Sequence, residues 1–303
     1  MISLDLASPP VTPALPGVMV RRLTPHRDER GAFTELFRDE WGLGVQPGSW
    51  ELAHIDAGAS RPMGDGVFVV LDGRLRLDSG GRSLTVEADA PTAVVVAPAA
   101  LVLASAQGER VMLAYGRPRL APAVVVDRRA GAQPALPSGV ELIDLPTDRE
   151  RTVLYDRSWG LGVEPVQWNA VRSRAGVLRG VHCHAQHADL LFMAEGRMRL
   201  GLADLRGGRR DVHCLDLTAS LPQLITIPPG VAHGFLFLEP SLHVYAVDRT
   251  WDTADELGCR WDDPALAMPW GQDPAALSAR DAELGSLDAL VLAMGFQTGA
   301  ARL

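Results

Sequence analysis

The 303 residues of the chain are 47% hydrophobic and 22% charged, which is the balance of a globular protein with one large domain or two ordinary ones. A net charge of −8 argues against a nucleic-acid partner, because phosphate binding needs clustered Lys and Arg. The sequence has no apolar stretch long enough to predict a membrane-spanning helix. Its N-terminus lacks the basic and apolar regions of a signal peptide. Cys183, Cys214 and Cys259 are too few for a disulfide framework, so we expect a cytoplasmic protein without membrane contact.

The predicted elements are strands for most of the chain. Residues 67–86, VFVVLDGRLRLDSGGRSLTV, are typical of a strand, a Gly-rich turn and a second strand. Residues 197–200 and 242–247 alternate polar and apolar side chains in part, as strands with one buried face do. Short strands at this spacing predict a sandwich or small barrel.

An internal repeat divides these strands into two sets. WGLGVQP at Trp41 returns as WGLGVEP at Trp159, 118 residues later, and GRLRL at Gly73 returns as GRMRL at Gly196. We therefore predict two copies of one all-β barrel, at residues 18–118 and 139–270, joined by a Pro/Ala/Gly-rich linker at residues 119–138. Apolar residues at helical spacing predict a helical tail at residues 271–303 that packs on the second copy.

The stretch GVLRGVHCHAQHAD, residues 176–189, carries the densest set of reactive side chains. His182 and His184 face the same way if they lie on a strand, because side chains at i and i+2 share a face. The stretch can equally be a polar turn on the surface. Spacing then relates it to PPGVAHGF downstream: Gly176, His182, His184, Gly196, Pro228, Gly230 and His233 fit G-x5-H-x-H-x4-E-x6-G followed by P-x-G-x2-H.

These two motifs resemble those of germin-like cupins, whose fold is a double-stranded β-helix, or jelly roll. The resemblance implies a metal bound by three imidazoles and a carboxylate, here His182, His184, His233 and Asp189, with Asp189 where the family usually has Glu. Such ligands suit Fe, Mn, Ni or Zn.

A second resemblance covers more of the chain. VQWNAVRSRAGVLRGVH (166–182), IPPGVAHGF (227–235), WDDP (261–264) and ALSARDA (276–282) occur in the order found in dTDP-4-dehydrorhamnose 3,5-epimerase, which is also a cupin. The resemblance implies proton abstraction beside the carbonyl of a 4-keto-deoxy sugar nucleotide, a small-molecule substrate, with no organic cofactor. It implies His182 as the base, Asp281 as the aspartate that holds it, and Tyr245 as the acid. Residues implied around the substrate are Arg179, Gln167, Asn169, Arg280 and Trp251.

The first copy lacks the histidines of the second but keeps a different segment of the epimerase pattern. It has Gly64 and Leu103 where the second has His182 and His233, but its DERGAFTELF segment (28–37) resembles the family's N-terminal motif. In the family that segment reaches the partner subunit's site. We therefore expect Arg30, Phe33 and Glu35 to complete the pocket of the second copy, giving a pseudo-dimer within one chain that can still pair as a homodimer.

Two positions depart from the epimerase pattern. Asp189 stands where the family has a lysine near the sugar carbonyl, and His184 replaces a glutamine. A divalent metal could take over the role of the ammonium group. His182 could not then be both a ligand and the base: Asp281 would orient it, and His187 or Tyr245 would be the base.

Three interpretations therefore stay open. The chain is a sugar-nucleotide epimerase or ketoisomerase, with or without a metal. Alternatively it is a metal-dependent cupin enzyme of another class, such as an oxygenase or lyase in a biosynthetic pathway, or a non-catalytic bicupin that binds a ligand.

Overall fold

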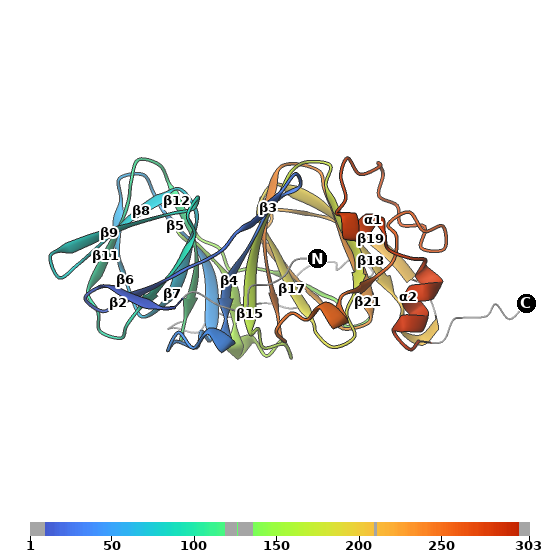
Figure 1. Cartoon of the computed structure of the whole chain (residues 1–303), viewed down its shortest axis with the longest axis horizontal. Helices are drawn as coiled ribbons and strands as arrows, with labels where there is room; N and C mark the ends of the chain where they lie inside the picture. The colour runs from blue at the N-terminus through green and yellow to red at the C-terminus, as the bar shows by residue number, and fades with distance from the viewer. Residues whose placement is uncertain (1–9, 119–125, 127–135, 209–210, 297–303) are drawn as a thin grey trace, which may run out of the picture.

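The computed structural model describes residues 10–118, 126, 136–208 and 211–296 (Figure 1). Among these residues strands dominate, and the strands within each sheet pair in antiparallel fashion. Four sheets result, two of seven strands, one of five and one of four. The predicted all-β jelly-roll class is confirmed, although the strands form separate facing sheets rather than closed barrels.

The first two sheets are built mainly from the N-terminal half. The seven-stranded sheet has, in spatial order, β1 (Thr12–Leu15), β2 (Val18–Arg22), β10 (Thr92–Val96), β7 (Gly66–Asp72), β12 (Val111–Arg117), β5 (Ser49–Ile55) and β14 (Arg151–Asp156). The four-stranded sheet has β6 (Ser60–Met63), β11 (Val102–Ala106), β8 (Arg74–Ser79) and β9 (Arg82–Glu87).

The other two sheets are built mainly from the C-terminal half. The seven-stranded sheet has β13 (Glu141–Asp144), β20 (Gln223–Ile227), β17 (Asp189–Glu195), β22 (Ser241–Val247), β15 (Gln167–Ser173), β4 (Gly31–Arg38) and β3 (His26–Asp28). The five-stranded sheet has β19 (Asp211–Thr218), β18 (Arg197–Asp204), β21 (Val231–Phe237), β16 (Leu178–Cys183) and β23 (Leu257–Gly258).

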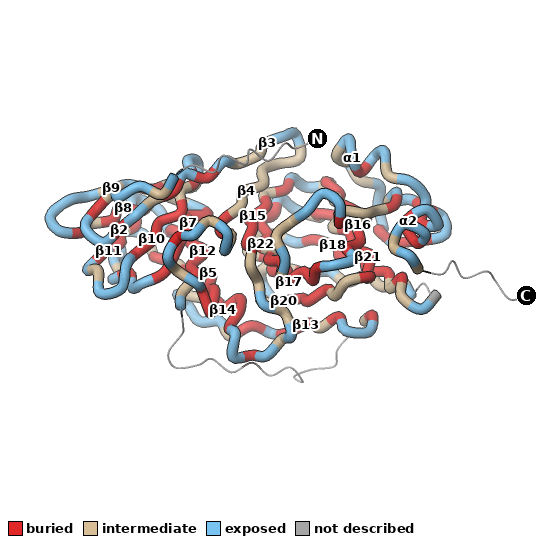
Figure 2. The backbone as a smooth tube through the Cα atoms, turned by 60° about the horizontal axis from the view of Figure 1, so that its bottom comes forward, coloured by how far each residue is buried: buried red, intermediate tan, exposed pale blue. Residues whose placement is uncertain are grey.

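Alternating side chains explain how these strands bury one face. In β8 the leucines Leu75 and Leu77 are fully buried, whereas Arg74 and Arg76 are exposed. The same alternation in β18 buries Met198 and Leu200. Figure 2 shows buried residues along the strands of both halves of the chain. Each pair therefore encloses its own apolar core.

A further core lies between the two seven-stranded sheets. Trp50 of β5 and Trp168 of β15, at positions that the sequence repeat relates, stack with ring centroids 4.7 Å apart. Phe37 meets Trp50 edge-on at 5.6 Å, and all three rings are at most 2% exposed. This shared apolar layer, with members from both halves, joins the two sheet pairs into four stacked layers.

The halves also exchange strands. β4, from the start of the chain, pairs with β15 in the second seven-stranded sheet, and β3 extends that sheet to its edge. In the opposite direction, β14 pairs with β5 in the first seven-stranded sheet. Each large sheet thus ends in strands from the other half of the chain.

Helices are short and few among the described residues. The 3₁₀ turns are η1 (Asp39–Trp41), η2 (Arg157–Trp159), η3 (Arg206–Gly208) and η4 (Thr253–Asp255), and the α-helices are α1 (Ala279–Ala282) and α2 (Leu287–Ala293). Leu287, Leu290 and Val291 of α2 pack with Cys259, Leu266 and Trp270. This helix covers the outer face of the five-stranded sheet (Figure 1).

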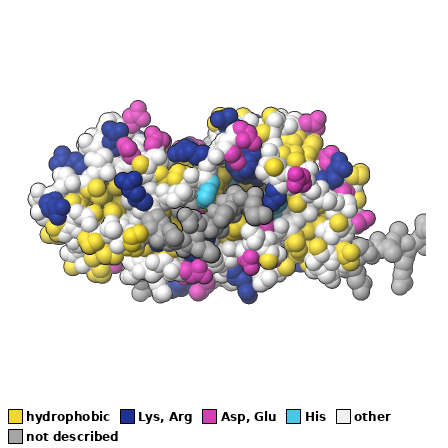
Figure 3. Space-filling view, viewed as in Figure 1, with side chains coloured by type: hydrophobic (Ala, Val, Ile, Leu, Met, Phe, Trp, Pro, Cys, Tyr) yellow, Lys and Arg dark blue, Asp and Glu magenta, His cyan; other side chains and the backbone are white. Residues whose placement is uncertain are grey.

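The predicted boundaries at residues 18–118, 139–270 and 271–303 remain predictions, and most of the predicted linker, 119–138, lies outside the described residues. Within the described part of the chain, no helix is long and apolar enough to cross a membrane. On the face shown in Figure 3, Arg side chains are interspersed with Asp and Glu, and the sequence contains no lysine.

Candidate active site

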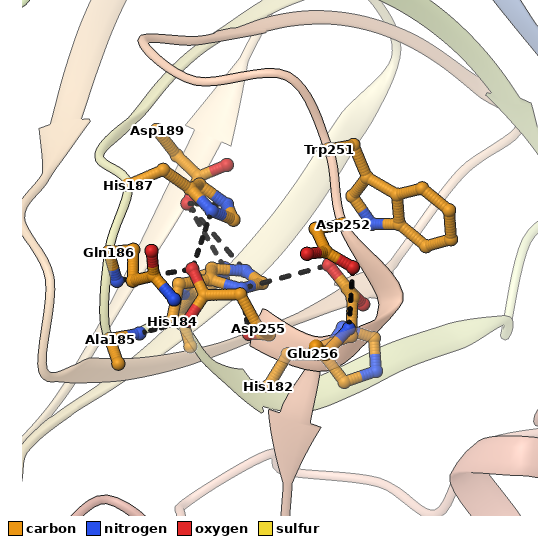
Figure 4. Close-up of polar contacts among 12 residues, drawn as sticks. His182, His184, Ala185, Gln186, His187, Asp189, Trp251, Asp252, Asp255 and Glu256 are labelled. Atoms are coloured by element: carbon orange, nitrogen blue, oxygen red, sulfur yellow. Dashed lines mark hydrogen bonds and ion pairs between the residues drawn. The ribbon is translucent and has the colours of Figure 1, made fainter.

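The conspicuous histidines lie where β16 passes into β17. β16 pairs with β21 so that His182 and His233 are register partners. The loop from His184 to Ala188 then leads to Asp189 at the start of β17, and the segment around η4 lies against this loop (Figure 4). Residues from three separate stretches therefore meet at one end of the second sheet pair.

His182 is held by an aspartate from the C-terminal tail. Its Nε2 donates to Oδ1 of Asp281 over 2.8 Å, and Asp281 lies buried in α1, whose N-cap Ser278 accepts from the Asp281 amide at 2.8 Å. Burial alone would raise the pKa of Asp281, but its hydrogen bond to His182 and the charge of that ring outweigh burial and lower the pKa to about 2. Because the ionised carboxylate can only accept, Nδ1 of a neutral His182 ring carries the lone pair.

Arg280 covers the same ring. Its Nη2 lies 2.8 Å from Nε2 and 3.4 Å from Nδ1 of His182, and its Nη1 donates to Oε2 of Glu256 at 2.8 Å. Burial would raise the pKa of Glu256, but attraction to His182, His184 and Arg280 lowers it to about 2. Glu256 is therefore ionised beside the predicted base.

Three other imidazoles surround a single carboxylate oxygen. Oδ2 of Asp189 lies 3.7 Å from Nε2 of His233, 3.8 Å from Nε2 of His184 and 4.0 Å from Nε2 of His187. All four side chains are less than a tenth exposed, and this oxygen has no hydrogen-bond partner among the described residues. We call these four residues the histidine cluster.

Asp255 orients two of the rings. Its carboxylate accepts from Nδ1 of His187 at 2.9 Å, and its main-chain carbonyl accepts from Nδ1 of His184 at 3.1 Å. The same carboxylate accepts from the amides of Ala185 and Gln186, so it also fixes the loop (Figure 4). The third ring, His233, donates from Nδ1 to the carbonyl of Val231 at 3.1 Å.

Burial sets the charge of the cluster. It lowers the pKa of His184 to about 4 and holds the pKa of His233 well below its usual value, so both rings are neutral at pH 7. Burial, reinforced by the charges of Glu256, Asp248 and Asp255, raises the pKa of Asp189.

The structure thus divides the predicted metal ligands. His184, Asp189 and His233 come together with ligand atoms within 4.8 Å of one another. His182 does not join them, because its ring is turned to Asp281 instead. His187 Nε2 lies 4.0 Å from Asp189 Oδ2, and His187 also groups with His184 and Asp255.

Tyr245 of β22 and Arg179 of β16 are half-buried. Burial, strengthened by nearby Glu256, Asp189 and Glu35, raises the pKa of Tyr245, so the phenol is protonated at neutral pH. Burial and the charge of Arg30 lower the pKa of Arg179 to about 10, which leaves it charged. Arg179 donates from Nε to Ser173 Oγ at 3.0 Å and is within electrostatic reach of both Tyr245 and Asp281.

The exchanged strand β4 brings the N-terminal motif to this sheet. Gln167 Nε2 donates to Glu35 Oε1 at 2.9 Å and to Asn169 Oδ1 at 3.0 Å, and Gln167 Oε1 accepts from the Trp251 amide at 3.0 Å. Gln167 and Asn169, predicted to hold substrate, are almost fully buried and already bonded within the protein. Their described contacts position Glu35 and Trp251.

Arg30 and Phe33 lie further along the same hairpin. Arg30 donates from Nε to Asp28 Oδ2 at 3.0 Å. The positive charge of Arg30 contributes to the lowered pKa of Arg179. The Phe33 ring is partly buried against His26, with centroids 6.0 Å apart, and its main chain pairs with Val171 of β15. Both predicted residues therefore belong to the sheet that carries the site.

Asp255 and Glu256 were missed by sequence reasoning. They stand in the loop sequence TADELGC with no periodicity or motif around them, and only the fold brings that loop against residues 182–187. Their one available signal was adjacency to Trp251, which the epimerase resemblance had already marked.

The facing antiparallel sheets with a buried His–Asp pair define a cupin-like protein. Comparison with known proteins then narrows the class. The family model for dTDP-4-dehydrorhamnose 3,5-epimerase matches residues 151–289. The chain is 33% identical over 134 residues to dTDP-4-dehydrorhamnose 3,5-epimerase of Pseudomonas aeruginosa, covering 42% of this chain and 74% of that protein. It is 32% identical over 111 residues to the spore coat polysaccharide biosynthesis protein SpsL of Bacillus subtilis, covering 34% of this chain and 72% of SpsL.

The crystal structure of NovW, a 4-keto-6-deoxy sugar epimerase from the novobiocin biosynthetic gene cluster of Streptomyces spheroides, superposes with a TM-score of 0.51 at 25% identity. The superposition covers 60% of this chain and 98% of NovW. The chain belongs to the dTDP-4-dehydrorhamnose 3,5-epimerase family. The family model begins at residue 151, so most of the first half lies outside the match.

Proposed function

We propose that the chain is a sugar-nucleotide epimerase that removes and returns a proton beside the carbonyl of a 4-keto-deoxy sugar nucleotide. The observation that carries this proposal is the hydrogen bond of 2.8 Å between His182 and buried Asp281. An ionised aspartate on Nε2 fixes the tautomer and stabilises the imidazolium that forms when Nδ1 accepts a proton. Family membership supports the same reaction class.

Tyr245 is the proposed acid. Its half-buried phenol keeps its proton at neutral pH and can therefore give it to the enolate that His182 creates. Arg179 interacts electrostatically with both Tyr245 and Asp281. This supports a common pocket for the acid and the base. Return of the proton from a different direction would invert the carbon.

Three arginines are the proposed partners of the diphosphate. Arg179 and Arg280 flank the dyad, and Arg30 reaches Arg179 from the exchanged hairpin. Guanidinium groups can bind phosphate oxygens in bidentate fashion. Trp251, partly exposed beside Gln167, is the proposed stacking surface for the nucleotide base.

We also propose that the two sequence copies act as one fused pseudo-dimer with a single complete site. The exchanged strands support this, because β4 supplies Glu35 to Gln167 whereas β14 carries no equivalent of the RGAF segment. A sugar nucleotide is then expected to bind once per chain, at the second copy.

The test is solvent exchange. A dTDP-linked 4-keto-6-deoxy sugar incubated with the protein in D₂O should gain deuterium at C3 or C5, detected by mass spectrometry and NMR. Absence of deuterium at both carbons would refute the proposal. The second candidate function is that of a metal-dependent enzyme of another class, and the histidine cluster is the observation that favours it. Purified protein that holds iron tightly, consumes oxygen and shows no deuterium exchange would support this second candidate. Tight ligand binding without turnover would indicate a binding protein.

A further inference from the structure

We infer that His184, His187, His233 and Asp189 form a binding site for one divalent transition-metal ion, and that His182 is not a ligand. The binding of the ion does not depend on the proposed function, although any role of the ion near the substrate carbonyl rests on it. The site differs from the predicted set because His187 takes the place of His182.

Hydrogen bonds made by the Nδ1 atoms of His184, His187 and His233 determine which nitrogen of each ring carries the lone pair. The groups that contact the three Nδ1 atoms are two main-chain carbonyls and the Asp255 carboxylate, which can only accept. Each ring must therefore carry its proton on Nδ1. The Nε2 atoms of the three rings then lie 3.7 to 4.0 Å from Asp189 Oδ2 on the side without the Nδ1 proton.

A water molecule satisfies such an arrangement poorly. Water has two protons to donate, whereas the cluster with Asp189 ionised presents four acceptors, namely three Nε2 atoms and one carboxylate oxygen. A divalent cation accepts electron pairs from all four. Imidazole nitrogen with one carboxylate oxygen is also a donor set that Zn, Fe, Ni and Co bind well.

The distances fit a bound ion. Two ligands that each lie about 2.1 Å from an ion can be at most about 4.2 Å apart. The three distances from Asp189 Oδ2, 3.7, 3.8 and 4.0 Å, all fall within that limit. Each ring also has an acceptor behind its Nδ1–H, which is the arrangement that orients histidine ligands and increases their basicity.

An acidic cavity borders the site at His187 and Asp255. Its charged lining is one cation, Arg249, against five carboxylates, namely Asp255 of the site region, Asp39, Glu40, Asp248 and Asp252, and His187 also borders it. The negative charge of this cavity attracts cations and repels a diphosphate. The diphosphate is instead proposed to bind three arginines that do not line the cavity, Arg30, Arg179 and Arg280. Ion and substrate would thus approach from differently charged surroundings.

The chemistry suits this chain in particular. The sequence contains no lysine, so no ammonium group can stabilise an enolate. A cation held by the cluster, within electrostatic reach of His182, would supply positive charge there and leave His182 free to act as the base.

The experiment is a Co²⁺ titration of tag-free protein stripped of metal with a chelator, followed by the visible absorption of Co²⁺ bound to imidazoles. One ion per chain is expected. Asp189→Asn, which keeps the shape of the side chain, and His187→Gln should each weaken binding about 100-fold or more. His182→Asn should bind as wild type does, and so should the control His213→Gln, on β19 outside the cluster.

Thermal unfolding provides a second measurement in case a variant folds poorly. Zn²⁺ should raise the Tm of the wild type but not that of Asp189→Asn. Failure of the wild type to bind Co²⁺, or equal binding by Asp189→Asn, would overturn the inference. Loss of binding in His182→Asn with normal binding in His187→Gln would instead restore the originally predicted ligands. Deuterium exchange by the same samples reports separately on the proposed function.

Discussion

At the scale of single residues, the direction of each histidine ring decides its chemistry. His182 and His184 are two positions apart, yet one ring meets Asp281 and the other faces Asp189. The difference comes from the groups behind them, an aspartate of the tail for His182 and the carbonyl of Asp255 for His184.

The first prediction concerns the dyad. Asp281→Asn should lower the rate of deuterium exchange about 100-fold or more, because the imidazolium loses its counter-ion and the tautomer is no longer fixed. The measurement is single-turnover exchange in D₂O at saturating sugar nucleotide. Asp211→Asn, an exposed change on β19, is the control, and an Asp281→Asn protein that exchanges at the wild-type rate would remove the dyad from the mechanism.

A second prediction separates acid from base. Tyr245→Phe should still exchange protons but should give an altered ratio of epimers, because His182 remains and only the donor is lost. Tyr115→Phe is a matched control, since Tyr115 faces Glu51 in β5 as Tyr245 faces Asn169 in β15. Product ratios measured by NMR that are normal in Tyr245→Phe would contradict the assignment.

The third prediction is an acid dependence of stability. Asp281 has a depressed pKa in the folded protein, so its stabilising contribution is fully present above pH 4 and is lost as the pH falls toward 2. At neutral pH this contribution is about 2 kcal/mol. Urea unfolding across this range should show a smaller loss of stability for Asp281→Asn than for wild type. Identical pH profiles would show that the carboxylate is not stabilised by folding.

The sequence predicted part of this site. His182 and Asp281 lie on motifs, and the family resemblance implied Tyr245, so resemblance alone could mark all three. Asp255 and Glu256 could not be found, because a carboxylate in a loop has no pattern until the fold brings it to its partners. The exchange of His182 for His187 in the cluster depends on ring orientation, which residue spacing does not determine.

At the scale of elements, the β3–β4 hairpin connects the first residues of the chain to the site. Gly31 starts β4 with a φ of +143°, and a Cβ there would overlap the carbonyl oxygen of Arg172. This glycine belongs to the RGAF segment, so the motif is explained by close approach of β4 to β15.

The fourth prediction follows from that contact. Gly31→Ala should destabilise the protein by about 3 kcal/mol and should weaken sugar-nucleotide binding, because the hairpin carries Arg30 and Glu35. Gly44→Ala is the control: its φ is also positive, at +74°, but nothing lies within 4 Å of the added Cβ. Calorimetric titration and urea unfolding measure both effects. Equal losses in the two variants would show that backbone strain alone, and not the β4–β15 contact, matters.

Strand type was predictable from alternation, and the family resemblance predicted that residues 28–37 reach the second copy, but the pairing of β14 with β5 was not predicted. The repeat suggested that each copy would hold its own sheets, whereas β4 and β14 each lie beside strands of the other half. Sequence periodicity reports which face of a strand is buried, and it carries no information about which strand lies alongside.

At the scale of the whole molecule, the apolar layer between the seven-stranded sheets binds the halves together. Its centre is the stacked pair Trp50 and Trp168, contributed by related positions of the repeat. Because the layer takes side chains from both halves, we expect them to unfold as one unit.

The fifth prediction tests this layer. Trp168→Ala should lower the free energy of unfolding by about 3–5 kcal/mol while the transition stays single. Leu101→Ala, at a side chain that is 89% exposed, should change it by less than about 0.5 kcal/mol. Urea denaturation followed by fluorescence and circular dichroism provides both values. Two separate transitions in either protein would show that the halves are independent.

The exchanged strands also impose an order on synthesis. Glu35 leaves the ribosome 132 residues before Gln167, the side chain that it finally contacts. Until then the β3–β4 hairpin has no sheet to join, and its unpaired edges are open to other nascent chains. A polysome that crowds several copies together would offer such hairpins the wrong β15, so chaperone protection of the early chain should matter more here than for a subunit of one sheet pair.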